Sequence, residues 1–182
     1  MTITKDEASE ALSEINAASG RLKQARAYAR MAPFLIIWGL VWMTCDVANQ
    51  FAPRFFWAWP AGIVAGFVAS WIVGRGMSKT ASDAGDWRDF VVWLIVMAFV
   101  TALFFVLPAT EPRQVHSVFG LVFGFIYVAF GLWTGWRMLA LGVALIVATF
   151  VGFYEIGAWY SLYMGLVSGG ALLLGGLWLR KI

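Results

Sequence analysis

The sequence is poor in the residues on which soluble proteins and many enzymes depend. It has one cysteine, one histidine and five prolines in 182 residues, and only 13% of its residues are charged. A single cysteine cannot form an intramolecular disulfide, so cysteine usage does not indicate a redox compartment. A single histidine excludes bis-histidine haem ligation within one chain, and zinc-type His/Cys spacing is missing. We therefore predict no metal site and no cofactor.

The motifs of common enzyme classes are missing as well. The sequence has no Ser-His-Asp set, no Gly-rich phosphate loop after a strand and no close pair of intramembrane aspartates. No nucleic-acid motif accompanies the net charge of +3. These absences predict a non-enzymatic protein without a nucleic-acid partner.

What the sequence does contain is apolar. Hydrophobic residues make up 62% of the chain, and its mean hydropathy is +0.79. Six apolar windows approach the ~20 residues that a helix needs to cross a bilayer. They run over about residues 32–51, 55–74, 90–108, 116–135, 137–157 and 158–179. We predict an all-α integral membrane protein with six transmembrane helices in a compact bundle.

The first thirty residues form a different region. They are too polar for a signal peptide, so we expect them to stay attached. They predict a separate N-terminal cytoplasmic helix over residues 1–30, capped by Thr4 and Glu7, ahead of a transmembrane domain over residues 31–182. Gly20 predicts a break or hinge in that helix.

An alanine-rich stripe runs along this N-terminal helix, where apolar residues recur at seven-residue intervals from Ala8 to Ala29. In one interpretation the helix is solvated, or lies at the membrane interface, and merely leads into the membrane. In the other, the stripe contacts a second copy or a cytoplasmic protein that binds residues 4–30.

The orientation follows from the thirteen Lys and Arg residues, because positively charged loops are retained in the cytoplasm. With the N-terminus inside, eleven of them lie on the inner side: Lys5, Arg21, Lys23, Arg26, Arg30, Arg75, Lys79, Arg88, Arg137, Arg180 and Lys181. Only Arg54 and Arg113 then lie outside. This bias predicts that both termini are cytoplasmic and that the protein contacts membrane lipids and their anionic headgroups. The chain also resembles many small bacterial inner (plasma) membrane proteins that have a cytosolic helix before the first span.

Small residues recur at four-residue spacing within several windows, which lets helix backbones approach closely. The predicted packing residues are Gly62, Gly66, Ser70, Gly120, Gly124, Gly165 and Gly169. They can make contacts within one bundle or form the interface of a homo-oligomer.

The most unusual residue in the apolar windows is Asp46. An ionisable side chain inside a membrane span costs roughly 2.5–3.5 kcal/mol, so it normally faces inward and is paired. Asp46 lies on the order of 6 Å beyond the midpoint of the first window, toward the outer side. Other polar groups gather at that side, and the predicted ligand-binding residues are Trp42, Asp46, Asn49, Gln50, Arg113, His116, Tyr154 and Glu155.

Two interpretations of Asp46 remain open. It can be neutralised structurally by Arg54 or Arg113, or it can bind a ligand or ion. The second interpretation gives an outward-facing polar pocket that binds a small ligand or lipid, with the N-terminal helix signalling to a cytoplasmic partner. Its alternative is a small oligomeric transporter or channel with Asp46 as the cation or proton site. Because the inner halves of the windows carry few polar side chains, we favour the binding protein.

Overall fold

The fold is known from a computed structural model, which describes residues 5–52, 57–77, 87–107 and 111–180. This part of the chain forms helices and short connections, which confirms the all-α prediction. The helices are α1 (Lys5–Phe51), α2 (Ala58–Gly76), α3 (Trp87–Val106), α4 (Pro112–Thr134), α5 (Trp136–Glu155), and a last helix made of α6 (Tyr160–Met164), the π-helical segment η1 (Gly165–Gly169) and α7 (Gly170–Leu179).

Five of the described helices are long and apolar enough to cross a membrane: Ser9–Phe51 within α1, α2, Arg113–Thr134 within α4, α5 and the last helix. The described apolar part of α3, Leu94–Val106, is shorter than these five. The observed helices follow the predicted windows closely, although the predicted ends at Phe55 and Pro108 fall outside the described residues. Six membrane crossings remain a prediction.

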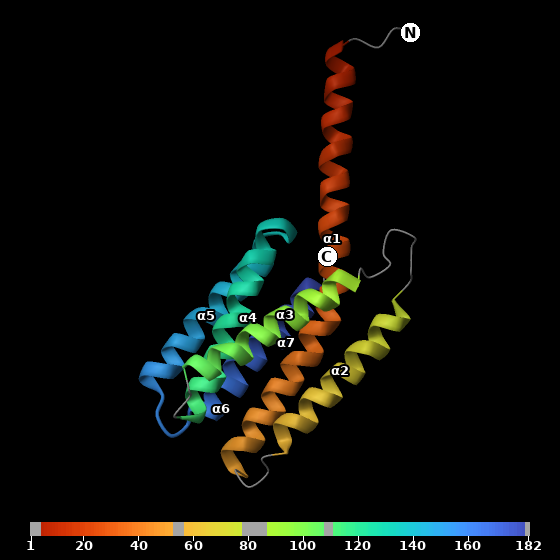
Figure 1. The fold of residues 1–182 in the computed structure, drawn as a ribbon. Helices are drawn as coiled ribbons and strands as arrows, with labels where there is room; N and C mark the ends of the chain where they lie inside the picture. The colour runs from red at the N-terminus through yellow and green to blue at the C-terminus, as the bar shows by residue number, and fades with distance from the viewer. Residues whose placement is uncertain (1–4, 53–56, 78–86, 108–110, 181–182) are drawn as a thin grey trace.

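Figure 1 shows both chain ends at the same end of the helix assembly. The first part of α1, coloured red, projects beyond the other helices there, while the second part, coloured orange, lies among them. In that second part α1 packs against α2 and against the last helix, and α4 packs chiefly against α5.

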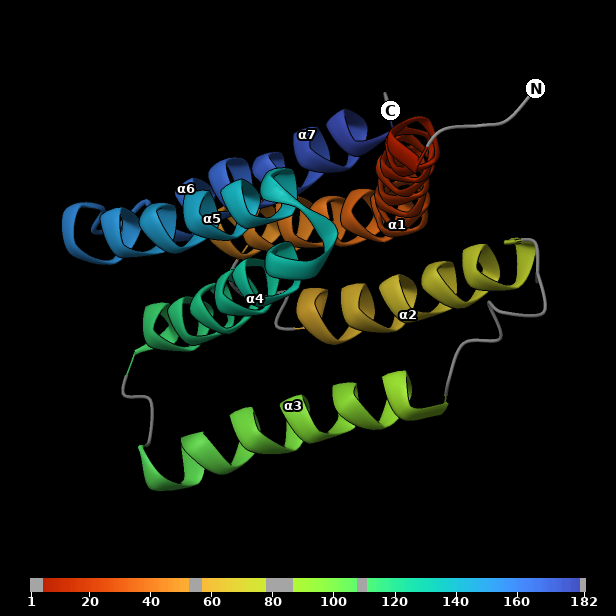
Figure 2. The ribbon, with the colours of Figure 1, turned by 90° about the horizontal axis from the view of Figure 1, so that it is seen from above.

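Helix α3 lies apart from the other helices, as Figure 2 shows most clearly. The structure differs here from the compact six-helix bundle that the sequence predicts. Large side chains on α3, including Leu94, Ile95 and Phe99, are more than half exposed. Helix α3 contains no glycine, unlike the glycine-containing helices that approach one another closely in this structure.

The predicted break at Gly20 is wrong, because α1 continues through this residue without interruption. An added Cβ at Gly20 would meet nothing within 4 Å, so no tertiary contact bends the helix there. A lone glycine costs only about 1 kcal/mol, and the surrounding Ala, Leu, Lys and Arg are good helix formers. Thr4 of the predicted cap lies outside the described residues.

Helix α1 does change direction further along. Figure 2 shows its first part end-on, whereas the second part runs across the view. Pro33 lies inside the helix and cannot donate a backbone hydrogen bond, which is a common cause of kinks. The 47 residues of α1 therefore combine a projecting segment and an apolar segment in one helix.

Glycines allow close contact between α1 and the last helix. A Cβ added to Gly169 would lie 2.9 Å from the backbone nitrogen of Met43 and 3.0 Å from the carbonyl oxygen of Gly39. Gly62 and Gly66 lie against α1 in the same way, since a Cβ added to Gly62 would overlap Cys45 Sγ and one added to Gly66 would lie 3.2 Å from the Val41 side chain. These contacts join helices within one chain.

Helices α4 and α5 approach each other just as closely. A Cβ added to Gly124 would lie 2.6 Å from Ile146, and one added to Gly120 would lie 2.5 Å from the Thr149 hydroxyl. Of the other predicted packing residues, Ser70 has a buried hydroxyl without a hydrogen-bond partner among the described residues. The predicted homo-oligomer interface remains a prediction.

Candidate functional site

Asp46 lies on α1 with only 1% of its surface exposed. It faces His116 near the start of α4, with its Oδ1 atom 3.5 Å from His116 Nδ1. Within the described ranges, His116 is the group that forms an ion pair with Asp46 when the imidazole is protonated. This arrangement agrees with the rule that an acidic residue in a membrane span faces inward and finds a partner.

Aromatic rings enclose this acid–histidine pair. The His116 ring lies 5.3 Å from the Trp59 ring of α2 and stacks against the Tyr160 ring of α6 at 6.5 Å, with an interplanar angle of 16°. Trp42 of α1 packs edge-on against Trp59 at 6.3 Å. Side chains from three helical segments, α1, α2 and α6, thus place aromatic surface around the Asp46–His116 pair.

Hydrogen bonds fix the aromatic wall in place. The hydroxyl groups of Tyr160 and Ser117 lie 2.6 Å apart and share a hydrogen bond. Ser117 also donates to the carbonyl oxygen of Arg113, one turn earlier in α4, at 2.7 Å. The start of the last helix is thereby tied to the turn of α4 that carries His116.

Three buried polar atoms in this cluster have no hydrogen-bond partner within the described residues: Asp46 Oδ1, His116 Nδ1 and Trp59 Nε1. A buried polar group without a partner typically costs about 1–3 kcal/mol. The carboxylate oxygen is an acceptor, the indole N–H is a donor, and the imidazole nitrogen is either one. The cluster can therefore bind a small polar or cationic group.

The π-helical segment η1 lies directly against Asp46. A Cβ added to Gly165 would lie 2.9 Å from the Cβ of Asp46 and 3.3 Å from the carbonyl oxygen of Met43. Glycine is required here because a side chain would push α1 away from the last helix. Short π-helical segments within α-helices occur frequently at functional sites.

Two amides of the predicted polar stripe along α1 form hydrogen bonds with the chain near the last helix. Asn49 donates from Nδ2 to the hydroxyl of Ser161 at 3.3 Å, and Gln50 donates from Nε2 to the carbonyl oxygen of Ala158 at 3.1 Å. Both amides bind the end of α1 to the chain around the start of α6. Of the predicted ligand-binding residues, the structure brings Trp42, Asp46 and His116 together.

The predicted pairing of Asp46 with Arg113 is not observed. Arg113 instead pairs with Glu111, and its guanidinium lies over the Phe153 ring at 5.3 Å. Arg54, the other predicted partner, lies outside the described residues. Glu155 is exposed at the end of α5.

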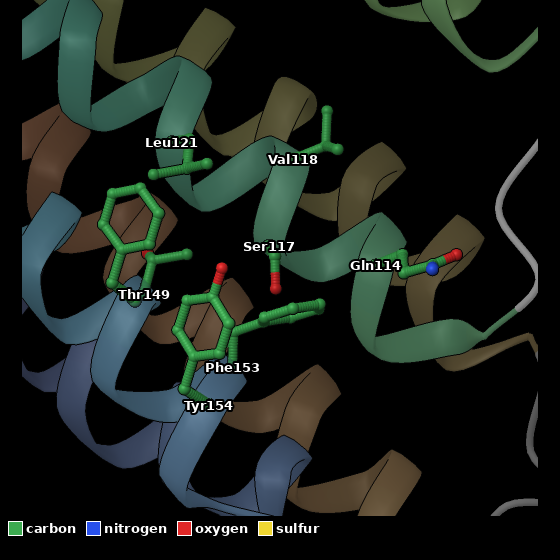
Figure 3. Close-up of a pocket in the computed structure, with 8 residues that line it drawn as sticks. Gln114, Ser117, Val118, Leu121, Thr149, Phe153 and Tyr154 are labelled. Carbon is green, nitrogen blue, oxygen red and sulfur yellow. The ribbon is translucent and has the colours of Figure 1, made fainter. Parts of the chain in front are cut away.

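An open groove of about 210 Å³ lies between α4 and α5, next to the enclosed pair. We call it the α4/α5 groove; its lining residues are Gln114, Ser117, Val118, Leu121, Thr149, Phe150, Phe153 and Tyr154. Figure 3 shows Tyr154 reaching from α5 toward α4 and Gln114 pointing away from the other side chains. Asp46 does not line this groove, and the predicted outward-facing pocket around it remains a prediction. Packed aromatic rings lie beside the Asp46–His116 pair.

The ligand-binding residues predicted from the sequence did not include Trp59, Ser117 or Tyr160. No residue spacing in the sequence predicts the contact between Trp59 and His116, because this contact depends on the rotation of α2 and α4 about their axes. Gly165 was predicted as a packing residue, and its glycine spacing gives no sign of its contact with Asp46.

Comparison of the chain with models of known protein families, with curated proteins and with solved structures found no match.

Proposed function

We propose that this chain is a non-enzymatic integral membrane protein that binds a small cation at Asp46 and His116. The observation that carries the proposal is the fully buried Asp46 carboxyl, whose Oδ1 faces His116 without a hydrogen bond. A residue this costly in a membrane span is a functional-site hypothesis by default.

The chemistry around Asp46 favours a cation. A carboxylate oxygen attracts positive charge, a neutral imidazole nitrogen can accept a hydrogen bond, and tryptophan and tyrosine rings attract cations over their faces. Trp42, Trp59 and Tyr160 supply such rings. Since the rings already contact one another, the ligand is ammonium-sized rather than a large organic molecule.

The arrangement of α1 suggests how binding is communicated. This one helix carries Asp46 near one end and the projecting N-terminal segment at the other. Its path passes Tyr28, which is buried against α5 and α7 residues in the core at the opposite end of the assembly. With the N-terminus in the cytoplasm, a displacement of α1 caused by binding at Asp46 would be transmitted along the helix to a cytoplasmic partner that contacts residues 4–30.

Tryptophan fluorescence of the purified full-length chain in detergent tests the binding site, because Trp42 and Trp59 lie beside it. Ammonium chloride is titrated in against N-methylglucamine chloride at constant ionic strength. The wild type should give a saturable signal, and Asp46→Asn should weaken the apparent affinity at least tenfold.

Glu155→Gln is the matched control, because it neutralises an exposed carboxylate near the same end of the assembly. It should retain the wild-type titration. A response of equal strength in Asp46→Asn, or a shared loss in both variants, would rule out Asp46 as the binding group.

A second candidate function is a small oligomeric transporter or channel that uses Asp46 as its cation or proton site. The observation that favours it is η1, a π-helical segment that lies against the ionisable Asp46, because such segments occur frequently at functional sites. Flux of ammonium into liposomes that contain the purified chain would support this function, provided that Asp46→Asn abolishes the flux. Binding without flux would support the first function.

A further inference from the structure

Two cavities lie on opposite sides of one ridge of α4. The first is the α4/α5 groove of about 210 Å³, and the second, which we call the α3/α4 groove, has a volume of about 420 Å³. Val118 and Leu121 line both grooves. A molecule that straddles these two side chains can therefore occupy both grooves at once.

Hydrocarbon is the chemistry that suits both grooves. The α3/α4 groove is lined only by aliphatic and aromatic side chains: Val96, Phe99, Leu103, Val118, Leu121, Val122, Phe125 and Ile126. In the α4/α5 groove, the Thr149 hydroxyl already donates to the carbonyl oxygen of Leu145 at 2.8 Å, and Ser117 is bound to Arg113 and Tyr160. Acyl chains can therefore cover these two hydroxyl groups without leaving either of them unsatisfied.

A pair of opposite charges lies beside the α4/α5 groove. Arg113 pairs with Glu111, and these side chains are 42% and 50% exposed. The Arg113 guanidinium lies over Phe153, which lines the groove. A headgroup above the groove would thus meet one cation and one anion side by side.

We propose that α4 binds one zwitterionic diacyl phospholipid of the phosphatidylethanolamine type. Its two acyl chains lie in the two grooves on either side of Val118 and Leu121. Its phosphate binds Arg113, and its ammonium group binds Glu111. An anionic lipid without an amine gains the first contact but meets the Glu111 carboxylate with like charge. This site does not depend on cation binding at Asp46.

Native mass spectrometry of the purified full-length chain tests the site, with phosphatidylethanolamine and phosphatidylglycerol of matched acyl chains as probes. The wild type should bind the first lipid at least tenfold more tightly for one molecule per chain. Glu111→Gln should remove that preference, because it deletes the carboxylate that distinguishes the two headgroups. Equal binding of both lipids by the wild type would overturn the proposal and indicate unspecific contact with the protein surface.

A second pair of variants separates the grooves from the rest of the lipid-facing surface. Val118→Trp places a large ring on the ridge that both grooves share and should abolish the tightly bound lipid. Leu132→Trp is the matched control on α4, because Leu132 is 71% exposed and lines neither groove. Unchanged binding in Val118→Trp would place the lipid elsewhere and overturn the proposal. If both variants lose the lipid, the ridge is not its binding site.

Discussion

At the scale of single residues, Asp46 contrasts with the two amides that follow it on α1. Asn49 and Gln50 find direct hydrogen-bond partners near the start of the last helix. Asp46 lies deeper and faces a histidine at a distance that leaves both atoms without a hydrogen bond. The two amides therefore stabilise the helix arrangement, whereas the Asp46 carboxyl remains able to bind a small cation.

Asp46 and His116 should be energetically coupled. Each single variant, Asp46→Asn or His116→Gln, removes one member of the ion pair that forms when His116 is protonated, so the free energy of unfolding should fall. The double variant should lose less stability than the two single variants lose together, and the difference is a coupling energy of about 0.5–3 kcal/mol. Reversible unfolding of the four proteins in detergent measures this coupling. Additivity within about 0.5 kcal/mol would show that the pair does not interact.

The hydroxyl of Tyr160 allows a finer test of the aromatic wall. Tyr160→Phe removes the hydrogen bond to Ser117, but Ser117 keeps its bond to the Arg113 carbonyl, so the loss should be only about 0.5–1.5 kcal/mol. Thermal unfolding in detergent measures it. Tyr154→Phe is the control, because Tyr154 is 74% exposed and should change stability little. Similar losses in the two variants would argue against the Ser117 contact.

The residue-scale site could be predicted only in part from the sequence. The free-energy cost of a charge in a membrane span is general, so Asp46 could be expected to face inward. Its partner could not be chosen, because Arg54, Arg113 and His116 all lie near the same side of the membrane in the prediction. Arg113 forms a local pair with Glu111, and the rotation of α4 brings His116 to Asp46 instead.

At the scale of helices, hydropathy predicted the elements well because each span must satisfy its own backbone hydrogen bonds. The continuity of α1 through Gly20 could not be predicted, since a single glycine weakens a helix without dictating a break. The π-helical turn of η1 has no sequence signal of its own. It arises where Gly165 and Gly169 lie tightly against α1, which depends on tertiary packing.

The close contact between α1 and η1 predicts a large effect from a small substitution. Gly169→Ala adds a methyl group 2.9 Å from a backbone nitrogen of α1, and the backbone cannot rotate away as a side chain could. Overpacking of this kind costs about 1–3 kcal/mol, so thermal stability in detergent should fall. Gly74→Ala on α2, where nothing lies within 4 Å, should not lose stability. Equal stability of the two variants would contradict the observed packing.

At the scale of the whole molecule, the two ends of the helix assembly differ in character. The end that holds the chain termini carries Arg–Trp contacts, with Arg75 over Trp71 at 4.6 Å and Arg137 over Trp178 at 4.7 Å. The opposite end holds the Asp46–His116 pair and the partly exposed charges of Glu111 and Arg113. Tryptophan and arginine gather at membrane interfaces, and the excess of arginine favours the cytoplasmic side for the end with the termini.

This asymmetry predicts the orientation in the membrane, which reporter fusions can measure. The fusion after residue 53 follows α1, the one after residue 111 precedes α4, and the one after residue 157 follows α5. All three positions are at the Asp46 end of the assembly, so these fusions should report the outer compartment. Fusions after residues 80, 136 and 182 should report the cytoplasm, where eleven of the thirteen Lys and Arg residues then lie. The fusions after residues 80 and 111 also test α3, because they report opposite compartments only if α3 crosses the bilayer. A cytoplasmic signal at two of the three outer positions would contradict the predicted orientation, and Asp46 would then face the cytoplasmic half of the membrane.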